Sequence, residues 1–265
     1  MVDPAILLAA VLIIGGAAIL SLAASLVTRR WIQSRLSEGH NDVAGFIFAT
    51  IGVIYAVLLA FVVFAVWDRF SKADDAVSSE AAALVTVYRD AQVLPPPQRH
   101  AAQQALISYA RTVPAKEWSS HGTLVAHTTP DPLNPVWAAF RAVKPTTTLG
   151  EGQLLAAEVD IHQLEVLRHQ RHLGQEASLP WIFWPVLIAG ALITVGFALA
   201  FSIENGATHA VLTAVLAGCV ASILFLIFGL DHPYTGMMHV SNQPFEHAIL
   251  QFHALDNGTP EQSLS

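Results

Sequence analysis

Four long apolar stretches stand out along the sequence. They cover residues 5–27, 45–67, 179–201 and 210–230, and none of them contains Asp, Glu, Lys or Arg. An α-helix needs about 20 mostly apolar residues to cross the hydrocarbon core of a bilayer. In lipid such a segment must be helical, because no water is present to satisfy its backbone polar groups. The pattern therefore predicts four transmembrane helices.

A polar region separates the second and third stretches. Residues 68–93 contain neither Pro nor Gly and continue the second stretch, so one long helix is predicted to leave the membrane. The Leu-Pro-Pro-Pro run at 94–97 ends it. Further elements are then expected: a helix over 98–113, a loop over 119–130, a short helix over 132–143, a turn over 144–150 and a helix over 151–175.

The segment after the fourth stretch is polar and contains Gly and Pro. We expect it to pack on the helical region and then to fray. The predicted organisation is an all-α integral membrane protein with four transmembrane helices and a helical extramembrane region between the second and third. Its parts are a first transmembrane helix pair (1–67), the extramembrane region (68–178), a second transmembrane helix pair (179–230) and a polar C-terminal tail (231–265).

The composition supports a membrane protein and argues against nucleic acid as a partner. Hydrophobic residues make up 54% of the 265 residues and charged residues only 12%, against about 25% charged in a typical soluble domain. The net charge of −7 leaves no clustered basic surface for nucleic acid. The lipid bilayer is therefore an expected partner, and nucleic acid is not.

The charges flanking the stretches leave the orientation open. Because the chain is predicted to cross the membrane four times, both termini and the polar region are expected on one side of it. Positive residues near the ends of transmembrane helices favour the cytoplasm. The opposite side has three (Arg29, Arg30, Arg35), and the side of the polar region has four (Arg69, Lys72, Arg168, Arg171). The first helix has no Lys or Arg before it and has Arg29 and Arg30 after it. Taken alone, this favours a polar region outside the cytoplasm.

The apolar stretches argue against coupled transport. Charges inside a membrane mark proton relays and ion-coupled transport, and here they are absent. A passive pore remains possible, because an apolar constriction can gate by dewetting. Tyr55 is the largest polar group deep in a stretch. For Tyr55 we expect a bond back to its own helix or a hydrogen bond to a neighbouring helix rather than contact with a substrate.

Charged residues gather where the second stretch ends. They are Asp68, Arg69, Lys72, Asp74, Asp75 and Glu80, and Asp231 lies at the matching end of the fourth stretch. One interpretation is a charged vestibule or cation site, because carboxylates on one rim attract hard cations. The favoured interpretation is a solvated helix face with ordinary ion pairs, of which Arg69 with Asp231 is one candidate.

A row of His and Glu residues follows on the last helix of the polar region. Glu158, His162, Glu165, His169 and His172 are separated by steps of 4, 3, 4 and 3, so they share one helical face. Imidazole and carboxylate at this spacing can bind a transition metal or sense protons. No second helix offers a matching cluster, so a plain polar face is favoured and no cofactor is expected.

Catalytic motifs give no support for an enzyme. The sequence has no Gly-rich phosphate loop, nucleophile elbow, HExxH or CxxC. We therefore expect a protein that is not an enzyme.

Two stretches carry a family resemblance. They are residues 41–76, with Glu80 shortly after, and residues 230–245. The pair Glu117–Trp118 adds to the resemblance. The sequence resembles the bacterial bestrophin-like family, long catalogued as a domain of unknown function. The matching residues are Asn41, Ala44, Gly45, Tyr55, Ala56, Leu59, Ala60, Phe61, Trp67, Asp68, Asp231, Pro233, Tyr234 and Gly236.

The resemblance implies a function. Bestrophins are oligomeric anion channels whose second helix lines the pore and carries an apolar neck. Residues 59–70 are similar to that helix, which implies a cytoplasmic helical region, in a bacterial inner membrane. Tyr55, Phe61 and Phe64 are the pore or neck candidates on this analogy.

The prediction is thus a passive ion channel that conducts inorganic ions, most simply anions. A homo-oligomer is expected, because four short uncharged helices are too few to enclose a polar path alone. The main alternative is a membrane scaffold or sensor that transports nothing and whose helical region binds a partner. A metal-dependent enzyme or metal sensor using the face from His162 to His172 is the third.

Overall fold

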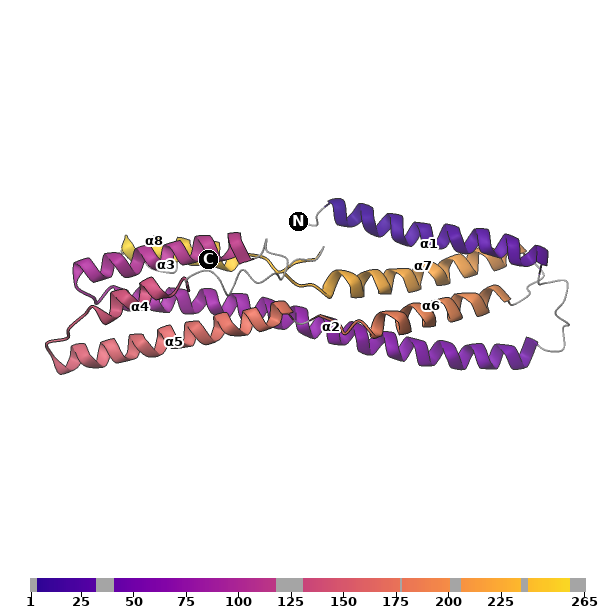
Figure 1. Cartoon of the computed structure of the whole chain (residues 1–265). Helices are drawn as coiled ribbons and strands as arrows, with labels where there is room; N and C mark the ends of the chain where they lie inside the picture. Colours follow the sequence, from indigo (N-terminus) through magenta and orange to yellow (C-terminus); the bar gives the residue numbers. More distant parts are fainter. Residues whose placement is uncertain are drawn as a thin grey trace. The chain divides into compact units, whose positions relative to one another are not determined.

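The chain folds into α-helices throughout the part that its computed structural model describes, residues 4–31, 41–117, 131–176, 178–200, 206–234 and 238–257 (Figure 1). These residues contain no strand. The helices are α1 (Pro4–Trp31), α2 (Asn41–Ala91), α3 (Pro96–Glu117), α4 (Asn134–Arg141), α5 (Thr148–Glu176), α6 (Phe183–Ala200), α7 (Gly206–Leu230) and α8 (Gln243–Asp256).

Two compact units share these helices. The first contains α1, α2 up to Asp68, α6 and α7, and the second contains α2 from Arg69 onward, α3, α4, α5 and α8. The long helix predicted from the absence of Pro and Gly after the second apolar stretch is α2, whose 51 residues contribute to both units.

The first unit holds four helices that are long and apolar enough to cross a membrane. Each contains most or all of one predicted stretch, and the fourth begins at Gly206 rather than at Ala210. The third begins at Phe183 and not at Leu179, because a turn precedes it. In this turn the amide groups of Phe183 and Trp184 donate to the carbonyl oxygens of Pro180 and Trp181, at 3.0 and 3.2 Å. The bonds span three residues, so the chain enters α6 through a tight turn.

Helices α1 and α7 lie side by side in the first unit (Figure 1). Small residues occupy their contact: Ser21 and Ser25 of α1 are buried, as are Ala214 and Ala217 of α7. A Cβ atom added to Gly218 would lie 3.7 Å from Cγ2 of Ile14. Small side chains let the backbones approach closely, which is the main way that helices associate in lipid.

The second unit has the hydrophobic core that a soluble helical domain would have. Apolar side chains from all five of its helices meet there, including Val77, Leu84, Leu106, Phe140, Ile161, Leu164, Phe245 and Phe252. On α2 the buried positions 73, 77, 81, 84 and 88 follow the three- and four-residue steps of one helical face. This periodicity begins where the uniformly apolar part of α2 ends.

Two helices of the second unit exceed their predicted limits. The second helix of the polar region was expected to end at Val113, but α3 continues through Pro114 to Glu117. The turn predicted over 144–150 is shorter, because α5 starts at Thr148. The Gly150 amide donates to Oγ1 of Thr147 at 3.1 Å, so the Thr147 side chain caps the start of the helix.

Helix α8 was not predicted. The tail was expected to pack on the helical region and then to fray, with no helix named in it, yet Gln243–Asp256 is helical and buries Phe245, Ala248 and Phe252. These residues follow steps of three and four, so the helical period was present within a segment that Gly and Pro marked as irregular. The predicted loop at 119–130 lies outside the described residues.

Candidate functional site

Within the first unit, α2 has two apolar faces with different environments. Tyr55, Leu59, Val62 and Val66 are buried. The opposite face is exposed along its length, at Phe46, Val53, Val57, Phe61 and Phe64. A helix that is apolar on both sides is expected in lipid, but its exposed side must be covered by acyl chains or by another protein chain.

The three aromatic residues predicted as pore or neck candidates fall on these two faces. Phe61 and Phe64 are 71% and 68% exposed, whereas Tyr55 is 6% exposed. The Tyr55 hydroxyl donates to the carbonyl oxygen of Leu187 in α6 at 2.9 Å. Tyr55 therefore holds α2 against α6, which is one of the two arrangements expected for it. Phe61 and Phe64 are the two candidates whose side chains face away from the other helices of the first unit.

Gly190 makes room for this contact. A Cβ atom at Gly190 would lie 2.3 Å from Cε2 and 2.4 Å from Cδ2 of Tyr55. The ring cannot retreat without giving up the bond from its hydroxyl to Leu187. A glycine in the middle of α6 is thus explained by the ring that packs over it.

Adding that methyl group tests the contact between α2 and α6. Gly190→Ala is expected to destabilise the first unit by about 1–3 kcal/mol, the usual cost of overpacking. Gly196→Ala in the same helix is the matched control, because nothing lies within 4 Å of its added Cβ. The measurement is the apparent melting temperature of the protein in detergent. Equal melting temperatures for the two variants would contradict this account of Tyr55.

An apolar groove of about 820 Å³ runs along α2, α6 and α7 in the first unit. Phe64 and Trp67 of α2, Thr194 of α6 and Cys219 of α7 are among the residues that line it. The groove reaches from the buried face of α2 round to Phe64. Its apolar lining can accommodate acyl chains or the helix of a second copy, and it offers no charged group to an ion.

The charged residues that follow this part of α2 differ in how far they are buried. Asp74 and Asp75 are exposed, and Asp68 and Arg69 are partly buried. Glu80 is fully buried. It therefore does not belong to an exposed rim, where the sequence placed it.

Glu80 forms a buried ion pair in the second unit. The Arg171 guanidinium of α5 donates from Nε to Oε2 of Glu80 at 2.5 Å and from Nη2 to Oε1 at 3.3 Å. The Tyr109 hydroxyl of α3 donates to Oε1 at 2.6 Å. Neither charged side chain has any exposed surface. Burial, and next the negative charge of Glu80, raise the pKa of Tyr109 well above its usual value, so its hydroxyl keeps the donated proton.

The row of His and Glu residues on α5 does not come together as a metal site. Oε1 of Glu165 accepts a bond from Nε1 of Trp137 at 2.5 Å, and Oε2 lies 3.1 Å from Nδ1 of His162. Within the described ranges no three His, Cys, Asp or Glu side chains are placed to hold a metal ion. The other members, Glu158, His169 and His172, lie along the same helix.

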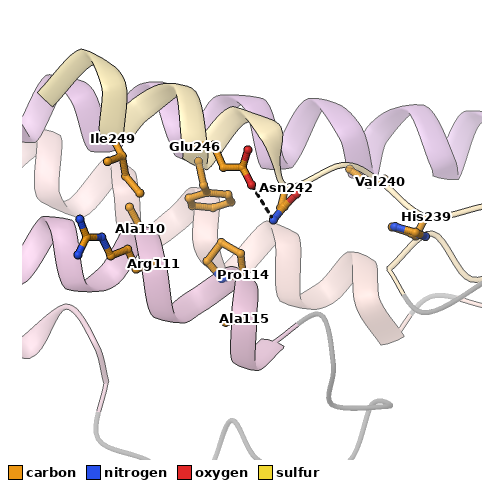
Figure 2. Close-up of a pocket in the computed structure, with 10 residues that line it drawn as sticks. Ala110, Arg111, Pro114, Ala115, His239, Val240, Asn242, Glu246 and Ile249 are labelled. Atoms are coloured by element: carbon orange, nitrogen blue, oxygen red, sulfur yellow. Dashed lines mark hydrogen bonds between the residues drawn. The ribbon is translucent and has the colours of Figure 1, made fainter. Parts of the chain in front are cut away.

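A cavity of about 400 Å³ lies in the second unit, between α3 and α8, and Figure 2 shows the residues that line it. Its apolar part is formed by Pro114, Phe245 and neighbouring residues, and its rim carries Arg111 and Glu246. Nδ2 of Asn242 donates to Oε1 of Glu246 at 3.4 Å. With one positive and one negative side chain at its rim, the cavity has no strong preference for ions of either sign.

Comparison with known proteins decides the family. A family model, the Bestrophin-like domain, matches residues 15–245, which is most of the chain. The chain belongs to the Bestrophin-like family. This confirms the resemblance found in the two sequence stretches. Together with the four apolar helices, membership of this family makes the chain a membrane protein.

A solved structure has the same fold as this Bestrophin-like chain. It is a crystal structure of a bacterial bestrophin homolog from Klebsiella pneumoniae that carries a point mutation. The TM-score is 0.72 at 13% sequence identity, and the match covers 91% of this chain and 99% of the other. A comparison with the curated proteins finds no match.

The second motif of this Bestrophin-like chain has a packing role. The Leu179 amide donates to Oδ1 of the buried Asp231 at 2.6 Å, which joins the start of the α6 region to the end of α7. In the second unit Pro233 and Tyr234 are buried, and the Tyr234 hydroxyl donates to the carbonyl oxygen of Ala73 at 3.3 Å. Gly236, the last matching residue, lies outside the described residues.

Proposed function

We propose that several copies of this chain form a passive ion channel, most simply for anions, in which the exposed face of α2 lines the pore. The proposal is carried by the face of α2 that contains Phe61 and Phe64. It is apolar, is not covered by any other helix of the first unit, and ends at charged residues from Asp68 onward. A ring of such helices would make an apolar constriction, which can gate by dewetting.

Two further observations support this function. No Asp, Glu, Lys or Arg occurs in any of the four apolar stretches, which disfavours an ion-coupled transporter. The Klebsiella pneumoniae protein of the same fold is described as a bestrophin homolog.

On the bestrophin analogy the second unit is an extramembrane vestibule, on the cytoplasmic side of a bacterial inner membrane together with both termini. Labelling of a Lys144→Cys variant in intact cells with an impermeant thiol reagent tests that placement.

Chloride efflux from liposomes that contain the purified protein tests the function. If Phe61 or Phe64 forms the neck, Phe61→Ala or Phe64→Ala widens it and eases its wetting, so efflux should increase several-fold over wild type. Leu192→Ala is the control, because Leu192 is equally exposed but lies on α6. It should leave efflux unchanged.

Other outcomes would redirect the proposal. Absence of efflux for wild type and both variants, over a range of pH and calcium, would support a membrane scaffold or sensor. Crosslinking in membranes checks the oligomer separately. A strict monomer would rule out a pore made by a ring of α2 helices.

A further inference from the structure

A second cavity, of about 470 Å³, lies in the second unit between α2 and α5. On the α2 side it is lined by Arg69, Lys72 and Asp75, among others, and on the α5 side by Leu167 and Leu173. It differs from the cavity in Figure 2 in its charge and in its place along the chain. It lies at the beginning of the second unit, where α2 changes from uniformly apolar to charged.

The charges of this cavity favour an anion. Two cationic side chains and one carboxylate give it a net charge of +1. Nη1 of Arg69 is buried and has no hydrogen-bond partner. A buried guanidinium donor without an acceptor is costly. A phosphate oxygen would satisfy it, because the planar fork of Arg matches phosphate geometry.

The shape of the cavity leaves space for more than an ion. Ala73 and Ala76 of α2 line it, and so does Gly174 of α5. A Cβ atom at Gly174 would lie 3.6 Å from the Tyr234 hydroxyl.

Burial raises the pKa of Tyr234 to about 12, so this hydroxyl stays neutral and adds no negative charge against an anion.

Its apolar side suits a ligand with a hydrocarbon part. Leu167 is partly buried, and Leu173 remains largely exposed although it is a large apolar side chain. An inorganic ion would leave both leucines uncovered. A phosphate ester with attached glycerol and acyl groups would cover them.

The position of the cations along α2 indicates where such a ligand comes from. Arg69 and Lys72 follow Trp67 by two and five residues. At 1.5 Å per helical residue they lie about 3 and 7.5 Å beyond it. Tryptophan at the end of a transmembrane helix favours the headgroup level. If residues 45–67 cross the membrane as proposed above, the cavity opens at the depth of the lipid phosphates.

We propose that the cavity beside Arg69 and Lys72 binds the phosphodiester of an anionic phospholipid headgroup. A phosphodiester with a neutral headgroup carries one negative charge, which balances the net charge of +1. A headgroup with its own ammonium would bring a cation next to Arg69 and Lys72. Phosphatidylglycerol should therefore bind and phosphatidylcholine should not. This inference depends on α2 crossing the membrane and not on whether the protein conducts ions.

Native mass spectrometry of the full chain in a neutral detergent tests the proposal, with each lipid added in turn. Wild type should bind phosphatidylglycerol more tightly than phosphatidylcholine. Arg69→Gln with Lys72→Gln should weaken phosphatidylglycerol binding by roughly tenfold or more, as loss of charged hydrogen bonds to phosphate predicts. The control is Arg111→Gln with Lys144→Gln, which changes the net charge equally at exposed positions outside this cavity. It should bind like wild type.

Adding dimethyl phosphate identifies the source of the phosphate group. If it does not displace phosphatidylglycerol, the ligand is the lipid; if it does, the phosphate site stands and a soluble ester can also fill it. Equal binding of the two lipids, or equal weakening by the control, would overturn the proposal. Should the cavity variant fail to fold, hydrogen exchange of wild type replaces it. Phosphatidylglycerol must then protect the segments that contain Arg69 and Leu173, and absence of protection would also overturn the proposal.

Discussion

Arg171→Met is expected to lower the free energy of unfolding of the second unit by about 3–5 kcal/mol. The change leaves the Glu80 carboxylate fully buried with Tyr109 as a remaining donor. An uncompensated buried charge costs far more than the ion pair itself contributes. Hydrogen exchange resolved by segment measures this, because amides of the second unit should exchange roughly 10²–10⁴-fold faster.

The controls separate the ion pair from the loss of a long side chain. Arg111→Met removes an exposed Arg from α3 and should change stability by about 0.5 kcal/mol or less. Glu80→Gln combined with Arg171→Met removes both charges and should cost less than the sum of the single changes. If the amides of the Arg171→Met and Arg111→Met variants exchange at the same rates, the Glu80–Arg171 ion pair does not hold the second unit together.

This ion pair was beyond the reach of sequence patterns. Glu80 lies in a run of charges that has the spacing of a solvated face, and Arg171 was counted only as a flanking charge. Their bond joins residues 91 positions apart, and no local period links them. Burial of a charged residue depends on the partner it meets, and the partner depends on how α2, α3 and α5 pack together.

The apolar helices and the family could be predicted, because both depend on local properties of the sequence. Length and hydrophobicity of a transmembrane helix are local properties, and the lipid requirement makes them strict. The family motifs are short and specific. The two faces of α2 were not predictable, because residues 45–67 are apolar all round and carry no amphipathic period. Only the contact with Leu187 and Gly190 shows that Tyr55 faces inward while Phe61 and Phe64 face out.

Phe252→Ala in α8 is the other change with a large expected effect, about 3–5 kcal/mol of destabilisation. Phe252 is fully buried. Its ring stacks on Tyr88, with centroids 4.1 Å apart and planes 8° from parallel. Oδ2 of Asp256, one turn later, accepts a bond from the Tyr88 hydroxyl at 2.7 Å. Removing the ring opens a cavity against α2 and weakens the anchoring of the whole helix.

The comparison with Leu250→Ala decides whether α8 belongs to the core. Leu250 is on the same helix and is 54% exposed, so its loss should cost about 0.5 kcal/mol or less. Hydrogen exchange should show faster opening at α2 residues near Tyr88 for Phe252→Ala only. If neither variant changed the exchange rates, α8 would be only loosely attached to the second unit. A strong effect of Phe252→Ala alone would mean that α8 is part of the core of the second unit and contributes to its stability.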